Sequence, residues 1–262
     1  MPSIDVHGLE IAYQQQGSGP PLLVLHSVLT DSRVWSRQIA GLSDAFTVVA
    51  WDAPGSGKSF DPPEDCSITD YVEALAGFID ALGLDRPHIA GAAWGTVLAF
   101  EFYRAYPKVA RSLVLASAYA GWSGSLPVEE VNRRVDRIRR ESTLPPDAVV
   151  ADWIPTLVTP AASREVVNEL AGIMREMRPL GVLSMMEAFA NVDSRDILPQ
   201  IDVPVKLIYG EADRRAPVHI GHELHAQIPK GELAIIPGAG HMVYLEAGEA
   251  FNAEVRGFLV GQ

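Results

Sequence analysis

The sequence His88-Ile89-Ala90-Gly91-Ala92-Ala93-Trp94-Gly95 joins a short apolar run to a helical pattern through a G-x-x-x-G frame. Small residues at both ends of such a frame let a strand and the helix that follows approach closely around a sharp turn. This is the geometry of a nucleophile elbow, which normally reads G-x-S-x-G. Here the central residue is Ala93, whose methyl group can neither attack a carbonyl nor accept a proton.

Other apolar runs on both sides of this stretch predict a sheet. They are continuous rather than alternating, which is typical of strands buried on both faces of a parallel sheet. Near the N-terminus, by contrast, two alternating segments around His7-Gly8-Leu9 predict an antiparallel hairpin. We therefore expect an α/β fold with a mostly parallel eight-stranded sheet and an antiparallel N-terminal edge. The expected strands are 4–7, 10–13, 22–25, 46–50, 88–90, 113–115, 205–209 and 233–236.

Helical periodicity appears between these runs and then takes over a long segment of its own. The segment 121–200 contains no strand-like run, and two stretches within it carry apolar residues three or four apart. We expect this segment to form a helical cap over the mouth of the sheet, inserted into a core made of 1–120 and 201–262. The helices expected in the core are 71–82, 94–106, 218–228 and 247–260, and those in the cap are 128–138 and 166–177.

Composition limits the partners of the chain. Its 262 residues carry a formal net charge of −12, which disfavours binding to nucleic acid or to anionic membrane surfaces. No apolar run reaches the roughly 18–20 residues of a membrane span. The single cysteine, Cys66, cannot form an intrachain disulfide, so we expect a cytoplasmic protein without a membrane or nucleic-acid partner. Nothing in the sequence predicts the oligomeric state.

Four further motifs resemble the α/β-hydrolase superfamily over essentially the whole chain. Residues 25–28 look like the loop after the family's third strand, and 51–59 are similar to the D-x-R/P-G-x-G-x-S turn of its lactonase, esterase and perhydrolase branches. Residues 209–213 resemble the strand end that carries a triad acid, and 238–242 the loop that carries a triad histidine. The order of elbow, acid and histidine is that of the family. The cap residues 183–198 look most like those of 3-oxoadipate enol-lactonases.

The resemblance implies a Ser-His-Asp mechanism without metal or cofactor. Ala93 occupies the nucleophile position, His241 would be the general base, and Asp213 would orient the histidine and stabilise its charged form. The backbone N–H groups of Val28 and Trp94 would hold the oxyanion. Some branches place the acid one strand earlier, but Ala116-Ser117-Ala118-Tyr119 offers no carboxylate there. The substrate pocket is expected to be lined by Ser27, Met185, Met186, Phe189 and Met242.

The absence of serine at position 93 leaves three explanations. We favour an introduced replacement of serine by alanine, because Asp213, His241 and the surrounding motifs are intact. The expected function is then hydrolysis of a carboxylic ester or lactone, with the present chain binding its small-molecule substrate without turnover. A natural inactive homologue that serves as a small-molecule binding protein is the second explanation. A haloalkane dehalogenase that has lost its aspartate is the third, since Trp94-Gly95 fits its D-W-G elbow.

Three other patterns have ordinary structural interpretations that we prefer. Residues 55–59 end like a phosphate-binding loop, but Asp52 stands where the first glycine belongs, which favours a structural turn. The histidines at 219, 222 and 225 point in different directions around one helix, so a solvated face is favoured over a metal site. The arginines between 133 and 140 alternate with acidic residues, so we expect an ion-paired surface.

Overall fold

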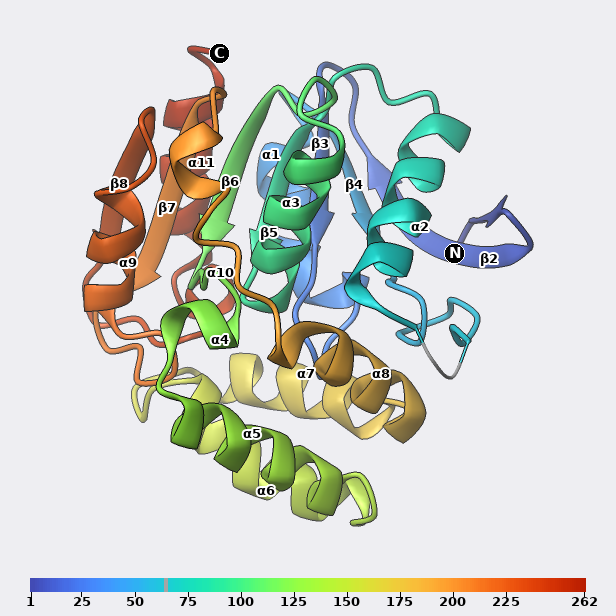
Figure 1. Cartoon of the computed structure of the whole chain (residues 1–262), viewed down its shortest axis with the longest axis vertical. Helices are drawn as coiled ribbons and strands as arrows, with labels where there is room; N and C mark the ends of the chain where they lie inside the picture. The colour runs from blue at the N-terminus through green and yellow to red at the C-terminus, as the bar shows by residue number, and fades with distance from the viewer. Residues whose placement is uncertain (64–65) are drawn as a thin grey trace.

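The computed structural model describes residues 1–63 and 66–262, and in this part of the chain the strands form one eight-stranded sheet (Figure 1). Its spatial order is β1-β2-β4-β3-β5-β6-β7-β8. The strands are β1 (Ser3–Val6), β2 (Leu9–Gln16), β3 (Pro21–Leu25), β4 (Thr47–Trp51), β5 (His88–Ala92), β6 (Ser112–Ala116), β7 (Val205–Gly210) and β8 (Gly231–Ile236).

The strand directions confirm the predicted sheet. All neighbours from β4 to β8 pair in parallel, whereas β1 pairs with β2, and β2 with β4, in antiparallel register. Parallel strands end at the same edge of a sheet, so the loops after β3, β5, β7 and β8 meet there. The elbow and the motifs at 25–28, 209–213 and 238–242 are on or next to these loops.

Helices cover both faces of the sheet, as parallel strands require. The helices α1 and α11 pack against each other on one face, and α2 and α3 pack together on the other (Figure 1). The core helices are α1 (Ser36–Leu42), α2 (Ile68–Ala81), α3 (Trp94–Ala105), α9 (Val218–His225), α10 (Val243–Glu246) and α11 (Gly248–Leu259). Two short 3₁₀ helices are η1 (Ser32–Trp35) and η2 (Leu198–Gln200).

Five helices between β6 and β7 lie together beyond the carboxyl ends of the strands (Figure 1). They are α4 (Trp122–Ser125), α5 (Val128–Glu141), α6 (Pro146–Leu157), α7 (Arg164–Arg175) and α8 (Pro179–Ala190). We call α4 to α8 the cap helices. The division into a core of 1–120 and 201–262 and a cap of 121–200 stays a prediction about independent units.

Three features differ from the sequence prediction. The last apolar run was expected to be buried on both faces, but β8 is the edge strand, and the side chain of Ile235 is 38% exposed. The predicted helix 218–228 ends at His225. The helices α1, α4, α6, α8 and α10 were not predicted. Pro155 lies inside α6 and Pro179 begins α8, and proline is a poor sign of a helix interior.

Among residues 1–63 and 66–262, no helix is both long and apolar enough to cross a membrane. The same residues contain no cluster of three or more His, Cys, Asp or Glu side chains with the geometry of a metal site. The cytoplasmic location inferred from composition stays a prediction.

Candidate active site

The predicted elbow is a sharp turn with strained backbone at its centre. Ala93 has φ 45° and ψ −103°, a conformation that residues with a side chain rarely adopt. The turn is also tightly packed, because a Cβ atom on Gly91 would lie 2.4 Å from the Gly95 carbonyl oxygen, and one on Gly95 would lie 2.4 Å from the Leu25 carbonyl oxygen. Both glycines are therefore needed where β5, α3 and the end of β3 approach each other.

The second part of the site joins Asp213, after β7, to His241, after β8. The Nδ1 atom of His241 lies 2.9 Å from Oδ2 of Asp213, and both residues are buried. The backbone N–H groups of Arg215 and Ala216 donate to the other carboxyl oxygen at 2.8 and 2.9 Å. Since Nδ1 is engaged with the carboxylate, Nε2 is the ring nitrogen left free to accept a proton.

Asp213 is held in its charged form. Burial opposes its ionisation, but the charge and hydrogen bond of His241, together with the two backbone donors, outweigh that effect and lower the pKa of Asp213. The backbone of His241 is fixed as well, because the hydroxyl of Ser117 donates to its carbonyl oxygen at 3.0 Å. The pair is thus an ionised carboxylate that orients the imidazole ring of His241.

Two backbone donors face the same region. Within the described residues, the N–H groups of Val28 and Trp94 have no protein acceptor, and Trp94 is the first residue of α3. His26 fixes the loop that carries Val28, because its Nε2 accepts from the Ala53 N–H at 3.0 Å and its Nδ1 lies 2.8 Å from the Ser27 carbonyl oxygen. Burial lowers the pKa of His26 and keeps it neutral, as this pair of bonds requires.

A small cavity brings these groups together. Its walls include Ala93, His241, Val28 and Trp94, and the free space within it is about 40 Å³, enough for about three water molecules. Of the pocket residues predicted from sequence, it contains Ser27, Met186 and Phe189. Its other lining residues, which the sequence did not reveal, are Leu29, Tyr119, Trp122, Ile138, Trp153, Leu157, Val182 and Arg215.

Comparisons with known proteins agree with this arrangement. The model of the "Alpha/beta hydrolase family" matches residues 22–254. The chain belongs to the α/β-hydrolase family. Among α/β hydrolases of known structure, an esterase from Thermogutta terrifontis covers 99% of this chain and 96% of its own, with a TM-score of 0.91 at 26% identity. The enol-lactonase from Burkholderia xenovorans LB400 covers 99% of this chain and all of its own, with a TM-score of 0.90 at 25% identity.

A sequence relative is similar over most of the same length. An uncharacterised protein from Mycobacterium tuberculosis is 28% identical over 91% of this chain and 75% of its own. The two proteins of known structure are an esterase and a lactonase, and both are hydrolases. Together with the family match, they indicate that the general activity of this chain is hydrolysis.

Two predicted pocket residues of this α/β hydrolase do not line the cavity. Met185 is fully buried between the cap and the core, where its Sδ lies 3.2 Å from the Ser56 hydroxyl oxygen and its carbonyl oxygen accepts from the indole N–H of Trp94 at 3.1 Å. Met242 is buried next to Tyr244, 3.4 Å from its hydroxyl oxygen. Both methionines are buried next to the site, and the structure places them outside the lining of this cavity.

The structural interpretation of the turn after β4 is supported by its hydrogen bonds. The carboxyl group of Asp52 accepts from the backbone N–H groups of Ser32 and Lys58, each at 2.8 Å. A Cβ atom on Gly57 would lie 2.1 Å from that same carboxyl group. Asp52 thus fills the concave side of the turn, where a phosphate would have to bind.

The arginines of α5 are largely ion-paired, as predicted. Glu130 pairs with Arg133 and Arg134, and Glu141 pairs with Arg137, at N–O distances between 2.6 and 2.7 Å. Arg139 reaches Glu187 on α8 at 3.2 Å, whereas Arg140 has no ion pair among the described residues. The sequence prediction did not include Arg214 and Arg215, although their position directly after the candidate triad acid Asp213 was a usable signal.

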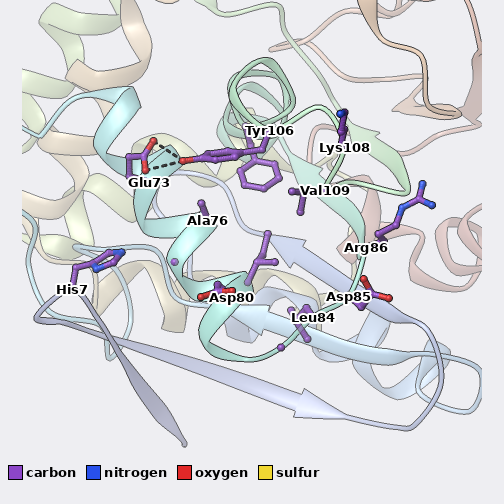
Figure 2. A pocket seen from close by; sticks show the side chains of 14 residues that line it. His7, Glu73, Ala76, Asp80, Leu84, Asp85, Arg86, Tyr106, Lys108 and Val109 are labelled. Atoms are coloured by element: carbon purple, nitrogen blue, oxygen red, sulfur yellow. Dashed lines mark hydrogen bonds between the residues drawn. The ribbon is translucent and has the colours of Figure 1, made fainter.

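A larger hollow of about 710 Å³ lies away from these groups (Figure 2). It is bounded by α2, the start of β5 and the end of α3, and its charged side chains have both signs, including Asp80, Asp85 and Arg86. Glu73 accepts from the Tyr106 hydroxyl group on its rim at 2.8 Å. None of the candidate catalytic residues lines it, so size alone does not identify the active site.

Proposed function

We propose that this site is that of a serine hydrolase for small esters or lactones, with alanine standing where the nucleophilic serine belongs. The observation that carries the proposal is the meeting of Ala93, His241 and the unpaired N–H groups of Val28 and Trp94 at one cavity. The strained elbow adds support. Strain of this kind costs about 1–3 kcal/mol and usually serves an exposed nucleophile, whereas a methyl group gains nothing from it.

With serine at position 93, the reaction follows from the geometry. The serine Oγ attacks the carbonyl carbon of the ester while Nε2 of His241 takes the hydroxyl proton, and the carbonyl electrons move onto oxygen. The N–H groups of Val28 and Trp94 donate to that oxyanion. When the carbonyl re-forms, the bond to the leaving oxygen breaks, and His241 returns its proton to the departing alkoxide.

Water then completes the cycle. His241 takes a proton from a water molecule, the resulting hydroxide attacks the acyl-enzyme, and the serine leaves with that proton as the carboxylic acid is released. In a lactone the alkoxide remains attached to the acyl group and leaves with it. As sequenced, the chain has no atom for the first step, so it should bind substrate and not consume it.

The first test is the Ala93→Ser variant. It should react with a fluorophosphonate probe and hydrolyse short-chain esters, whereas the parent and the Ala93→Ser/His241→Ala double variant should do neither beyond background. Silence of Ala93→Ser toward both reagents, with the fold intact by circular dichroism, would overturn the proposal. Retained binding of intact esters in that case would leave a small-molecule binding protein as the function.

The dehalogenase explanation has less structural support. The tryptophan next to the nucleophile position would have to hold the departing halide with its indole N–H, but the indole N–H of Trp94 already donates to the Met185 carbonyl oxygen at 3.1 Å. The Ala93→Asp variant tests this alternative, because only a dehalogenase should then release bromide from a short bromoalkane.

A further inference from the structure

Arg215 is a cation in the wall of the candidate cavity that forms no ion pair with a carboxylate among the described residues. Among the described residues, no Asp or Glu side chain forms an ion pair with its guanidinium. The carboxyl group of Asp213 is nearby in sequence, but one oxygen faces His241 and the other accepts the backbone N–H of Arg215 itself. Arg215 is half-buried, and charges that are partly removed from water are normally paired, so its side chain lacks a usual partner within the described residues.

The contacts that hold Arg215 leave most of its donors unused. Its guanidinium carbon lies 4.4 Å from the centre of the Trp153 ring, and Nη1 donates to the Thr156 hydroxyl oxygen at 3.3 Å. A guanidinium has five N–H donors in a planar fork. Burial lowers the pKa of Arg215 to about 10, so the group is still charged at neutral pH.

Arg137 provides a comparison within the same cluster. Its guanidinium carbon lies 4.6 Å from the same Trp153 ring, yet its Nε donates to a Glu141 carboxyl oxygen at 2.6 Å. The other oxygen of Glu141 accepts from the indole N–H of Trp153. Each oxygen of Glu141 thus already has a donor, and neither forms an ion pair with Arg215.

Arg215 also belongs to a second, outer hollow. That hollow has a volume of about 520 Å³, shares Arg215 and Trp153 with the inner cavity, and is lined by four further arginines and one acid. The additional charged residues are Arg133, Arg134, Arg137, Arg214 and Glu130. The chain has a net charge of −12, but the outer hollow has a local excess of positive charge. This excess attracts anions to the outer hollow.

We propose that the substrate carries a carboxylate in addition to its ester or lactone group, and that Arg215 binds this carboxylate. The inference rests on the proposed function, because it assigns a substrate class to the same site. A guanidinium fork matches the two oxygens of a carboxylate, and the pairing supplies the partner that the fold does not. In this arrangement the carbonyl group to be cleaved lies next to Ala93. The carboxylate lies next to Arg215, which lines both hollows.

Binding to the chain as it stands gives the first test, since Ala93 prevents turnover. Calorimetry would compare the monomethyl esters of malonate, succinate and glutarate with their dimethyl esters, which lack the carboxylate. At least one monoester should bind about tenfold or more tightly than its diester, as expected for a charge-assisted hydrogen bond. The preference should weaken as salt is added.

Substitutions then assign the preference to one residue. Arg215→Met keeps the length of the stem and its packing on Trp153, and should abolish the preference. Arg215→Lys keeps the charge without the fork and should retain part of it. Arg214→Met is the matched control, because Arg214 is exposed, lines only the outer hollow and donates to the Pro155 carbonyl oxygen at 3.1 Å. It should leave the preference unchanged.

The outcomes separate this inference from the proposed function. Equal binding of monoesters and diesters, an unchanged preference in a folded Arg215→Met protein, or no binding of any ester would overturn the role of Arg215. Hydrolysis of monoesters and diesters at equal kcat/KM by Ala93→Ser would leave the hydrolase and remove the carboxylate requirement. If Ala93→Ser has no activity but the parent binds monoesters in a way that depends on Arg215, the role of Arg215 stands and the hydrolase function is overturned.

Discussion

The Nδ1 atom of His241 lies 2.9 Å from the Asp213 carboxylate, although 28 residues separate the two in sequence. They meet because β7 and β8 are neighbouring parallel strands that end at the same edge of the sheet. This is the arrangement that the proposed mechanism needs for its general base, whereas Ala93 offers no nucleophilic atom. The role of the pair can be measured once serine is restored.

Asp213→Asn in the Ala93→Ser background should reduce kcat for ester hydrolysis by about 10⁴-fold, because an amide at this position favours the wrong tautomer of the imidazole. Asp44→Asn is the control, since Asp44 is an exposed residue that pairs with Arg256 at 2.6 Å. Steady-state kinetics of folded variants would provide the comparison. Equal kcat values for the two substitutions would contradict the assignment of Asp213.

Ala93→Gly should increase the free energy of unfolding by about 1 kcal/mol, because glycine relieves the strain of a residue at φ 45° at a smaller entropic cost. Ala92→Gly provides the opposite case. Ala92 is in β5, so glycine there should lower stability by roughly 0.5–1 kcal/mol or more. Urea unfolding measures both, and a destabilised Ala93→Gly protein would show that the elbow is not strained.

Trp94→Phe should lower the free energy of unfolding by about 1–3 kcal/mol beyond the loss of packing, because the Met185 carbonyl oxygen would lose its donor in a buried place. Trp51→Phe is a matched control, since Trp51 is equally buried and its indole N–H has no hydrogen-bond partner. Similar losses in the two variants would mean that the bond between α3 and α8 contributes little.

His88 should make the protein less stable in acid. Burial, with a smaller contribution from the charge of Arg111, lowers the pKa of His88 from 6.5 to about 4. Between these values the unfolded chain binds a proton that the folded chain does not, so stability is full above about pH 6.5 and falls as the pH approaches about 4.

The His88→Asn variant isolates this effect, because the amide can replace Nδ1 in the hydrogen bond with Ser112. Its melting temperature should fall less than that of the parent over the same pH interval. His219→Asn, at an exposed position on α9, should follow the parent. Parallel curves for the parent and His88→Asn would show that other groups cause the acid sensitivity.

Much of the architecture was predictable because local patterns and chain order determine it. Continuous apolar runs predicted β3 to β8, two alternating segments predicted β1 and β2, and the order of the three motifs predicted which loops meet. The edge position of β8 was not predictable, because its Leu-Ala-Ile-Ile run reads like that of a central strand. The exposure of a strand depends on whether other strands lie on both sides of it. The order of strands in the sheet decides this, and the apolar run of a single strand does not show it.

The cavity lining was harder to predict than the catalytic pair. Met185 and Met186 are adjacent on α8, yet only Met186 faces the cavity, because the rotation of a helix decides which of two neighbours points inward. Arg215 was missed for a related reason. Its lack of a carboxylate partner depends on where the cap places Glu141, and no spacing in the sequence encodes that.

Trp94 joins two requirements in a single residue. It lines the cavity at the start of α3, while its indole N–H donates to the Met185 carbonyl oxygen on α8 of the cap. Helix α8 contributes Val182, Met186 and Phe189 to the cavity wall, so a substrate large enough to displace α8 would also act on the residue proposed to hold the oxyanion. Size discrimination should therefore appear in the rate of the chemical step, so that large substrates bind and react slowly instead of failing to bind.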